Sequence, residues 1–152
     1  MPIERSFNLN ISESLFRLVT ESVRLFSNHC LRCSNIGDVV NHRAAAANSI
    51  PSHYRPGSLK EHLRIIPTDG NINLKLTIMS TSSLALEDAI TQLSEAIGSP
   101  VSFASVVSIV LFDFVVEENI TEVINKLGLN LEDAAAFLKA ARRSETNVIP
   151  FR

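Results

Sequence analysis

The chain of 152 residues has the length of one ordinary domain, or of two very small ones that share a core. Hydrophobic residues make up 45% of it and charged residues 20%, which excludes a disordered or fibrous protein and predicts a folded one. The formal net charge of −2 excludes a protein that coats nucleic acid or anionic membrane by bulk charge alone, so any such binding has to be local.

The cysteine content and the N-terminal sequence bear on the compartment. Two cysteines are too few for a disulfide scaffold, and residues 1–5 lack the apolar segment of a signal peptide, so we expect a cytoplasmic protein. The longest apolar run, Val101 to Val116, is shorter than the roughly 20 residues that a membrane span requires. We therefore predict a buried helix there and no membrane partner.

A strand followed by two helices is predicted first. Residues 6–11 alternate polar and apolar side chains with the period of a half-exposed strand. The residues after it have the spacing of one face of an amphipathic helix: Leu15, Leu18, Val19, Ser22, Leu25 and Phe26. A second helix is predicted from three further apolar residues: Ile36, Val39 and Val40. Ser12 or Ser14 is the expected N-cap of the first helix, and Ser34 or Asn35 that of the second.

A connector is predicted over residues 49–69, where Pro51, Pro56 and Gly57 disfavour regular structure. The order of strand, helix and helix then recurs. Residues 71–78 alternate in the same way as residues 6–11. Two helical faces follow them, the first with Leu86, Ala89, Ile90, Leu93, Ala96 and Ile97, and the second with Phe103, Val106, Val107, Val110, Leu111 and Phe114.

The second copy differs from the first in its spacing. Ten residues separate Leu76 from Leu86, whereas four separate Ile11 from Leu15, so we expect an extra turn between strand and helix. The expected N-caps of the two helices in this copy are Ser82 or Ser83, and Ser102.

We expect the two predicted strands to pair with each other, because a single strand has no partner for its backbone hydrogen bonds. Paired antiparallel, they form a ribbon with one face toward the helices and one toward solvent. The inward set is Phe7, Leu9, Ile11, Ile72, Leu74, Leu76 and Ile78. The outward set is Ser6, Asn8, Asn10, Asn71, Asn73, Lys75 and Thr77. The predicted fold class is therefore mostly α with a two-stranded antiparallel ribbon, plus C-terminal helices.

The segment Phe7-Asn8-Leu9-Asn10, followed by two helices and then repeated, resembles the strand of the ribbon-helix-helix family of DNA-binding proteins. The resemblance covers about residues 5–48 and 70–118, joined by the connector 49–69. It implies a tandem ribbon-helix-helix pseudo-dimer over residues 1–118, as a monomer whose copies pair with each other or as a homodimer. Residues 119–152 are expected to form a C-terminal helical pair and tail.

The resemblance also implies sequence-specific binding of double-stranded DNA by a transcriptional regulator or accessory factor, with the ribbon in the major groove. Four outward side chains suit this role, since Asn can bond adenine through two atoms and Lys can donate to guanine: Asn8, Asn10, Asn73 and Lys75. The residues expected to contact phosphate precede the first strand or begin the second helices: Arg5, Ser34, Asn35 and Ser102.

The cysteines raise one metal-site alternative. Cys30 and Cys33 follow His29, but only eight residues separate Cys33 from His42, where a Cys2His2 finger requires about twelve. We therefore expect two semi-buried thiols that close a helix turn, and neither a metal nor another cofactor. A small metal-dependent protein that uses Cys30, Cys33 and His29 remains an alternative. Because the sequence contains no nucleophile motif and no glycine-rich phosphate loop, we do not predict an enzyme.

Two short helices are predicted in the C-terminal part, over Ile120 to Leu127 and Leu131 to Arg143, with Asn130 as N-cap of the second. The apolar face of the second contains Ala134, Ala135, Phe137, Leu138 and Ala141. This pair either packs on the core or docks a partner. In the second case residues 120–143 would make the chain a protein-interaction module, such as an antitoxin-like or adaptor protein, whose complexes depend on Phe137 or Leu138.

Overall fold

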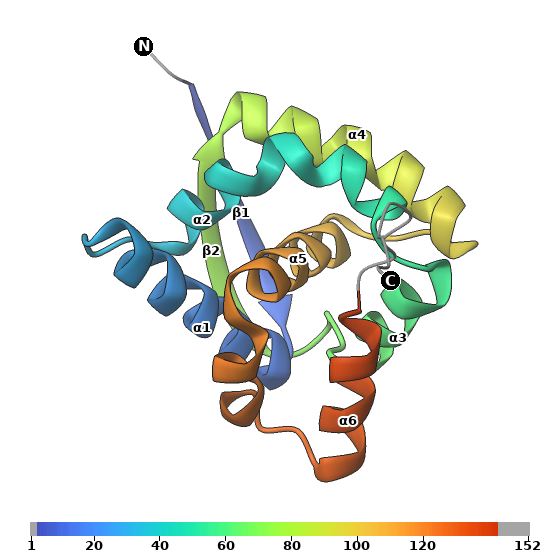
Figure 1. Ribbon diagram of the computed structural model, residues 1–152. Helices are drawn as coiled ribbons and strands as arrows, with labels where there is room; N and C mark the ends of the chain where they lie inside the picture. The colour runs from blue at the N-terminus through green and yellow to red at the C-terminus, as the bar shows by residue number, and fades with distance from the viewer. Residues whose placement is uncertain (1–2, 143–152) are drawn as a thin grey trace, which may run out of the picture.

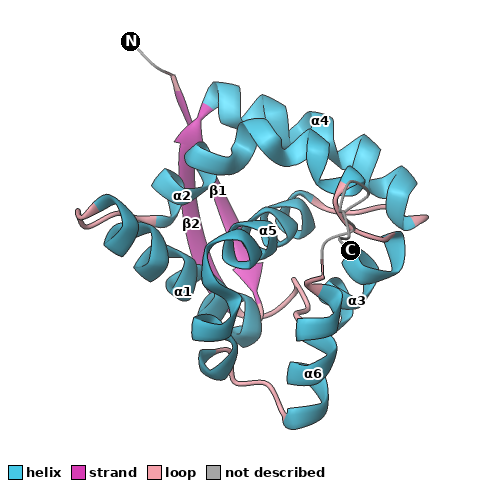
Figure 2. Cartoon of the chain, viewed as in Figure 1, coloured by secondary structure: helices cyan, strands magenta, loops and turns pink. Residues whose placement is uncertain are grey.

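The computed structural model describes residues 3–142, and it confirms a mostly α-helical fold with one two-stranded antiparallel sheet (Figures 1 and 2). The elements in chain order, with η for a 3-10 helix, are β1 (Glu4–Ile11), α1 (Glu13–Cys30), α2 (Ile36–Arg43), η1 (Ala44–Ser52), α3 (Pro56–Ile65), β2 (Ile72–Met79), α4 (Ser80–Ile97), α5 (Phe103–Val123), η2 (Ile124–Lys126) and α6 (Leu131–Ala140). No helix within residues 3–142 has both the length and the apolar character needed to cross a membrane.

The strands β1 and β2 pair in a register that places apolar residues opposite apolar ones. Phe7 lies across from Leu76, and Leu9 across from Leu74. The inward side chains pack against the helices, and Leu76 and Ile78 are fully buried. The predicted antiparallel pairing and its apolar face are therefore confirmed.

The order of strand, helix and helix occurs twice, as β1-α1-α2 and β2-α4-α5. A constant spacing of 67 residues relates the two units. It connects the left-handed C-caps of the first helices, Leu31 with φ 58° and Gly98 with φ 86°. It also connects the N-caps of the second helices, Asn35 and Ser102.

Hydrogen bonds in the two helix turns repeat at the same spacing. The backbone N–H of Ser34 donates to Ser27 Oγ at 3.0 Å, and the N–H of Val101 donates to Ser94 Oγ at 3.1 Å. Each of these serines also accepts, through its carbonyl oxygen, the N–H of the C-cap residue of its helix. The repeat is therefore present in the polar contacts of the fold as well as in its apolar pattern.

This spacing corrects the expected alignment of the copies, which made Leu86 the counterpart of Leu15. Helix α4 begins directly after β2, so the extra turn expected between strand and helix is absent. Ser82 and Ser83, expected as N-caps, lie in the first turn of α4 and are buried, and the cap position is Met79. The apolar positions of a helix recur at every turn, which is why periodicity alone allowed a shift of one turn.

Helix α5 lies at the centre of the molecule in Figure 1. All residues from Ser105 to Val115 are buried, which confirms the predicted buried helix. A helix that is apolar on every side has to be covered on every side, and α1, α2, α3, α4 and η1 all contact it. Its backbone leaves the helical range at Asn119, whose side chain accepts the N–H of Glu122 and so caps the last turn.

The segment between the copies contains the helix α3, where the sequence predicted only a connector. Helix α3 packs against α6. Phe137 of α6 is fully buried and meets Phe112 of α5 at a ring-centroid distance of 5.3 Å, so the C-terminal helix packs on the core. The helix predicted from Ile120 to Leu127 corresponds to the end of α5 and to η2. The helix predicted from Leu131 corresponds to α6, which ends at Ala140; its predicted end, Arg143, lies outside the described residues.

Asp113 is a carboxylate buried within α5, only 2% exposed. Arg43 donates to one of its oxygens at 2.6 Å, and the hydroxyl of Tyr54 donates to the other at 2.7 Å. Arg43 also pairs with Glu117 at 2.7 Å. A buried charge requires such partners, and here they connect α2 and the turn before α3 to α5.

His62 of α3 is fully buried against α5 and α6. Its Nε2 lies 2.8 Å from Ser108 Oγ, and its ring stacks on Phe112 at 4.3 Å. Its Nδ1 has no hydrogen-bond partner among the described residues. Burial lowers the pKa of His62 to about 3, because the imidazolium would lose its hydration there, while hydrogen bonding to Ser108 acts in the opposite direction.

This depressed pKa predicts a pH-dependent stability. Between about pH 6.5 and pH 3 the unfolded chain binds a proton on His62 that the folded chain excludes, so the free energy of unfolding falls as the pH falls. On lowering the pH from 7.5 to 4.5 the protein should lose about 2–3 kcal/mol more than a His62→Leu/Ser108→Ala variant. Urea unfolding at the two pH values measures this difference, and equal losses in the two proteins would contradict it.

Candidate nucleic-acid interface

The outward face of the ribbon carries the four side chains predicted to contact DNA bases. Asn8 lies opposite Lys75, and Asn10 lies opposite Asn73. All four residues are exposed, and within residues 3–142 none of their side chains has a hydrogen-bond or ion-pair partner. We call these two neighbouring cross-strand pairs the Asn–Lys patch.

The position of the patch follows from the pleat of the strands. Successive side chains of a strand point to opposite faces, and the helices cover the face opposite the patch (Figure 2). Cα atoms of directly opposed residues in an antiparallel pair lie about 4.5–5.5 Å apart, so the three amides and the ammonium group belong to one compact surface. The structure therefore brings all four predicted base-contacting residues together.

The two ends of the ribbon present different chemistry. The spacing of 67 residues makes Lys75 the counterpart of Asn8, so the pseudo-twofold axis passes through this pair. Asn10 and Asn73 lie on one side of the axis. On the other side Ser6 and Thr77 face each other, with their hydroxyl oxygens 2.9 Å apart in a hydrogen bond. The patch is thus off-centre, with amides at one end and hydroxyls at the other.

A cavity of about 310 Å³ lies beside the patch, between β2 and the first turn of α2. Its lining includes Lys75 and Thr77 from the ribbon and Asn35 from the start of α2. Two carboxylates, Glu4 and Asp38, line the same cavity. The positive end of the α2 dipole and Lys75 favour an anion here, whereas the two carboxylates oppose it.

Asn35 and Ser34 have structural roles at the start of α2. The side chain of Asn35 accepts the N–H of Asp38 at 3.0 Å, and the carboxylate of Asp38 accepts the N–H of Asn35 at 2.9 Å, which completes a capping box. The Ser34 hydroxyl donates to the carbonyl oxygen of Arg32. The predicted cap at Asn35 is confirmed, and of these two residues only Asn35 lines the cavity with Lys75.

The other residues expected to contact phosphate lie apart from the patch. Ser102 is exposed and caps α5, where its Oγ accepts the N–H of Ser105 at 3.1 Å. Arg5 lies on the same side of the ribbon as Phe7, and its guanidinium donates to Ser83 at 3.0 Å and to Glu87 at 3.3 Å. The Arg5 side chain thus binds α4 in this structure.

The cysteine turn differs from expectation. Cys30 and Cys33 are both exposed, so the thiols are not semi-buried. His29 is exposed as well, and its Nδ1 lies 3.7 Å from a carboxylate oxygen of Glu118. Within the described residues no group of three or more His, Cys, Asp and Glu side chains is arranged to hold a metal ion.

Gly37 is a residue of this region that the sequence analysis missed. A Cβ at this position would overlap the carbonyl oxygen of Thr77, so only glycine allows α2 to lie directly against β2. A glycine in the first turn of a predicted helix was the available signal, because glycine lowers helix stability and needs a compensating reason. Gly37 therefore sets the distance between α2 and the patch.

Comparison with known proteins assigns no family to this chain, because no family model, no curated protein and no solved structure matches it.

The contact at Gly37 predicts a glycine-specific effect on stability. Gly37→Ala should lower the free energy of unfolding by about 1–3 kcal/mol, because α2 has to move away from β2. Gly57→Ala in α3 is the matched control, since a Cβ there meets nothing within 4 Å, and it should be neutral or stabilising by up to about 1 kcal/mol. Urea unfolding of the two variants measures both effects; equal stability of the two would show that α2 does not depend on this close approach.

Proposed function

We propose that the chain binds double-stranded DNA by placing the β1–β2 ribbon in the major groove, as its resemblance to the ribbon-helix-helix family implies. It would act as a transcriptional regulator or accessory DNA-binding factor. The observation that carries the proposal is the Asn–Lys patch, in which four exposed side chains without partners among the described residues share one uncovered face.

The chemistry of the patch fits base edges. The major groove admits a two-stranded β-ribbon, and there adenine offers an acceptor and a donor that Asn can bond together. Guanine offers two acceptors, to which Lys can donate. Asn residues are disfavoured in strands, so three of them side by side on an exposed face are better explained by a ligand than by strand stability.

The off-centre position of the patch has a consequence for the DNA site. Asn10 and Asn73 would meet one half-site, whereas Ser6 and Thr77, already bonded to each other, would meet the other. Amides distinguish adenine more strongly than a hydroxyl pair does. The proposal therefore includes a non-palindromic site whose specificity is concentrated in one half.

Electrostatics should contribute little to the affinity. Lys75 is the one cation on the outward face of the described strands, and Glu4 lies on the same face. A protein that neutralises few phosphates shows a shallow dependence of affinity on salt. We expect a slope of log K against log salt of about −1 to −3, in line with one to three phosphate contacts.

Removal of the single patch cation should weaken and broaden recognition. Lys75→Ala is expected to lower affinity for a duplex selected from a randomised pool by about 1–3 kcal/mol, and to relax the preference at one base position. Lys60→Ala removes the same charge from an exposed position on α3 and is the matched control.

Selection from random duplexes followed by fluorescence anisotropy measures both quantities. An unchanged base preference in the Lys75→Ala protein, with the same affinity as the Lys60→Ala control, would contradict a role of Lys75 in base recognition.

A second candidate function, a protein-interaction module, is favoured by two exposed leucines on α6. Leu131 is 91% exposed and Leu138 39% exposed. Phe137, the other side chain expected to contact a partner, is fully buried and is not available. Apolar contacts through these leucines would survive high salt, whereas contacts with DNA phosphates would weaken.

A further inference from the structure

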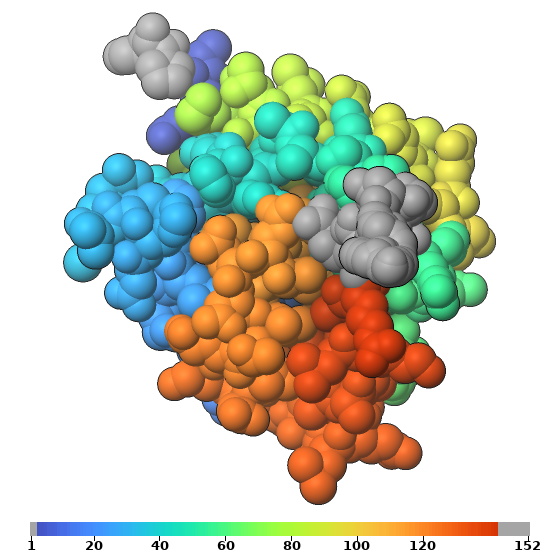
Figure 3. Space-filling view, viewed as in Figure 1, coloured from blue at the N-terminus to red at the C-terminus, as the bar shows by residue number. Residues whose placement is uncertain are grey.

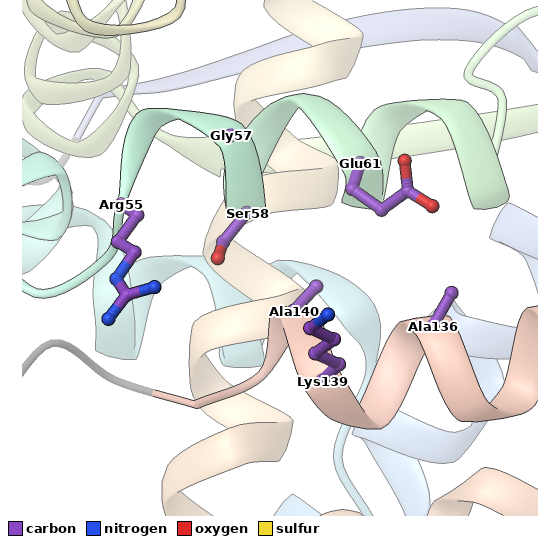
Figure 4. Close-up of a pocket in the computed structure, with 7 residues that line it drawn as sticks. All are labelled: Arg55, Gly57, Ser58, Glu61, Ala136, Lys139 and Ala140. Carbon is purple, nitrogen blue, oxygen red and sulfur yellow. The ribbon is translucent and has the colours of Figure 1, made fainter.

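A second cavity, of about 510 Å³, lies between α3 and α6 and contains no residue of the ribbon. Its lining is Arg55, Gly57, Ser58 and Glu61 from the α3 side, and Ala136, Lys139 and Ala140 from α6 (Figure 4). Sites for small molecules commonly have volumes of about 300–1,000 Å³, so this one suits a small ligand.

Two cationic side chains flank the cavity, one from the residue before α3 and one from α6. Arg55 and Lys139 are exposed, and neither pairs with a carboxylate of residues 3–142. The one carboxylate in the lining, Glu61, is already bonded to Arg64 at 2.6 Å and 3.0 Å. In Figure 4 the Arg55 side chain and the Ser58 hydroxyl lie at the end of the cavity where α6 ends, while the Glu61 carboxylate lies at the opposite end. The Arg55 end of the cavity is therefore positive.

The rest of the lining is apolar and small. Gly57, Ala136 and Ala140 contribute no polar side chain, and a Cβ on Gly57 would meet nothing within 4 Å. In Figure 4 the side chains of Ala136 and Ala140 point toward α3. These small residues leave open space between two helices that larger side chains would fill.

Contacts outside the cavity hold the two helices in place. Phe137 of α6 lies 5.9 Å from His62 of α3, measured between ring centroids, in the buried core. Arg64 of α3 also reaches Asp133 of α6 at 3.4 Å. Because these contacts fix α3 and α6 without the cavity residues, the cavity is a preformed site.

We propose that this cavity binds a small amphiphile with one carboxylate, such as an aliphatic monocarboxylic acid. Arg55, Lys139 and the Ser58 hydroxyl would bind the carboxylate, since an arginine can offer it two parallel N–H donors. Gly57, Ala136 and Ala140, with the aliphatic stems of Arg55 and Lys139, would contact the apolar chain. This binding is independent of the proposed DNA contact.

Isothermal titration calorimetry with octanoate tests the proposal, with octan-1-ol as the uncharged ligand of equal chain length. We expect saturable binding of one octanoate per chain with a Kd below about 1 mM, and at least tenfold weaker binding of octan-1-ol. Arg55→Gln/Lys139→Gln should weaken octanoate binding at least tenfold. Lys60→Gln/Lys126→Gln removes two exposed lysines that do not line the cavity and should change the affinity by less than about twofold.

A second variant separates charge from shape. Ala136→Leu enlarges a side chain that lines the cavity and points toward α3 in Figure 4, so the protein should fold and lose octanoate binding with its cations intact. Circular dichroism checks the fold of each variant. No saturable binding of octanoate, equal binding of octan-1-ol, or unchanged affinity in either the Arg55→Gln/Lys139→Gln or the Ala136→Leu protein would overturn the proposal.

Discussion

The antiparallel pairing of β1 with β2 is the contact on which the rest of the structure depends. Each strand alone would leave a row of backbone donors and acceptors without partners, and the pairing satisfies them between segments far apart in the chain. The pairing also determines which face of the ribbon is buried and which is exposed. One face is apolar and needs cover, which the helices of both copies provide around the central helix α5. The other face is left polar and free for a ligand.

Much of this arrangement could be predicted from the sequence, because strand alternation depends only on neighbouring residues. The two strands, the outward position of the Asn–Lys patch and the N-caps at Asn35 and Ser102 follow from local patterns that the structure confirms. The alignment of the two copies could not be predicted in the same way, because helical periodicity permits a shift of one turn. The left-handed C-caps Leu31 and Gly98 show that the spacing is 67 residues. Helix α3 was not predicted, because proline and glycine generally disfavour a helix. In the structure Pro56 and Gly57 form its first turn, where proline is tolerated.

The cavity between α3 and α6 could not be predicted for a different reason. It depends on which helices face each other, and neither the amphipathic pattern of α6 nor the composition of residues 49–69 contains that information. Small residues normally indicate close packing of helices, but here a cavity lies beside Ala136 and Ala140. Phe137 and the Arg64–Asp133 contact connect the two helices outside it. The outward face of the ribbon and this cavity are separate surfaces. Each presents polar or charged side chains that take no part in the packing of the core.

The central claim, that the Asn–Lys patch binds DNA, is tested most directly by fluorescence anisotropy with a labelled duplex selected from a randomised pool, at about 50 and 200 mM salt. The protein is compared with a variant in which Asn8, Asn10, Asn73 and Lys75 are alanine. A control replaces three exposed asparagines and one lysine elsewhere: Asn28, Asn48, Asn125 and Lys126. We predict binding that weakens only modestly between the two salt concentrations, and that the patch variant loses and the control retains. Absence of binding at low salt, or equal binding by the patch variant, would contradict the account.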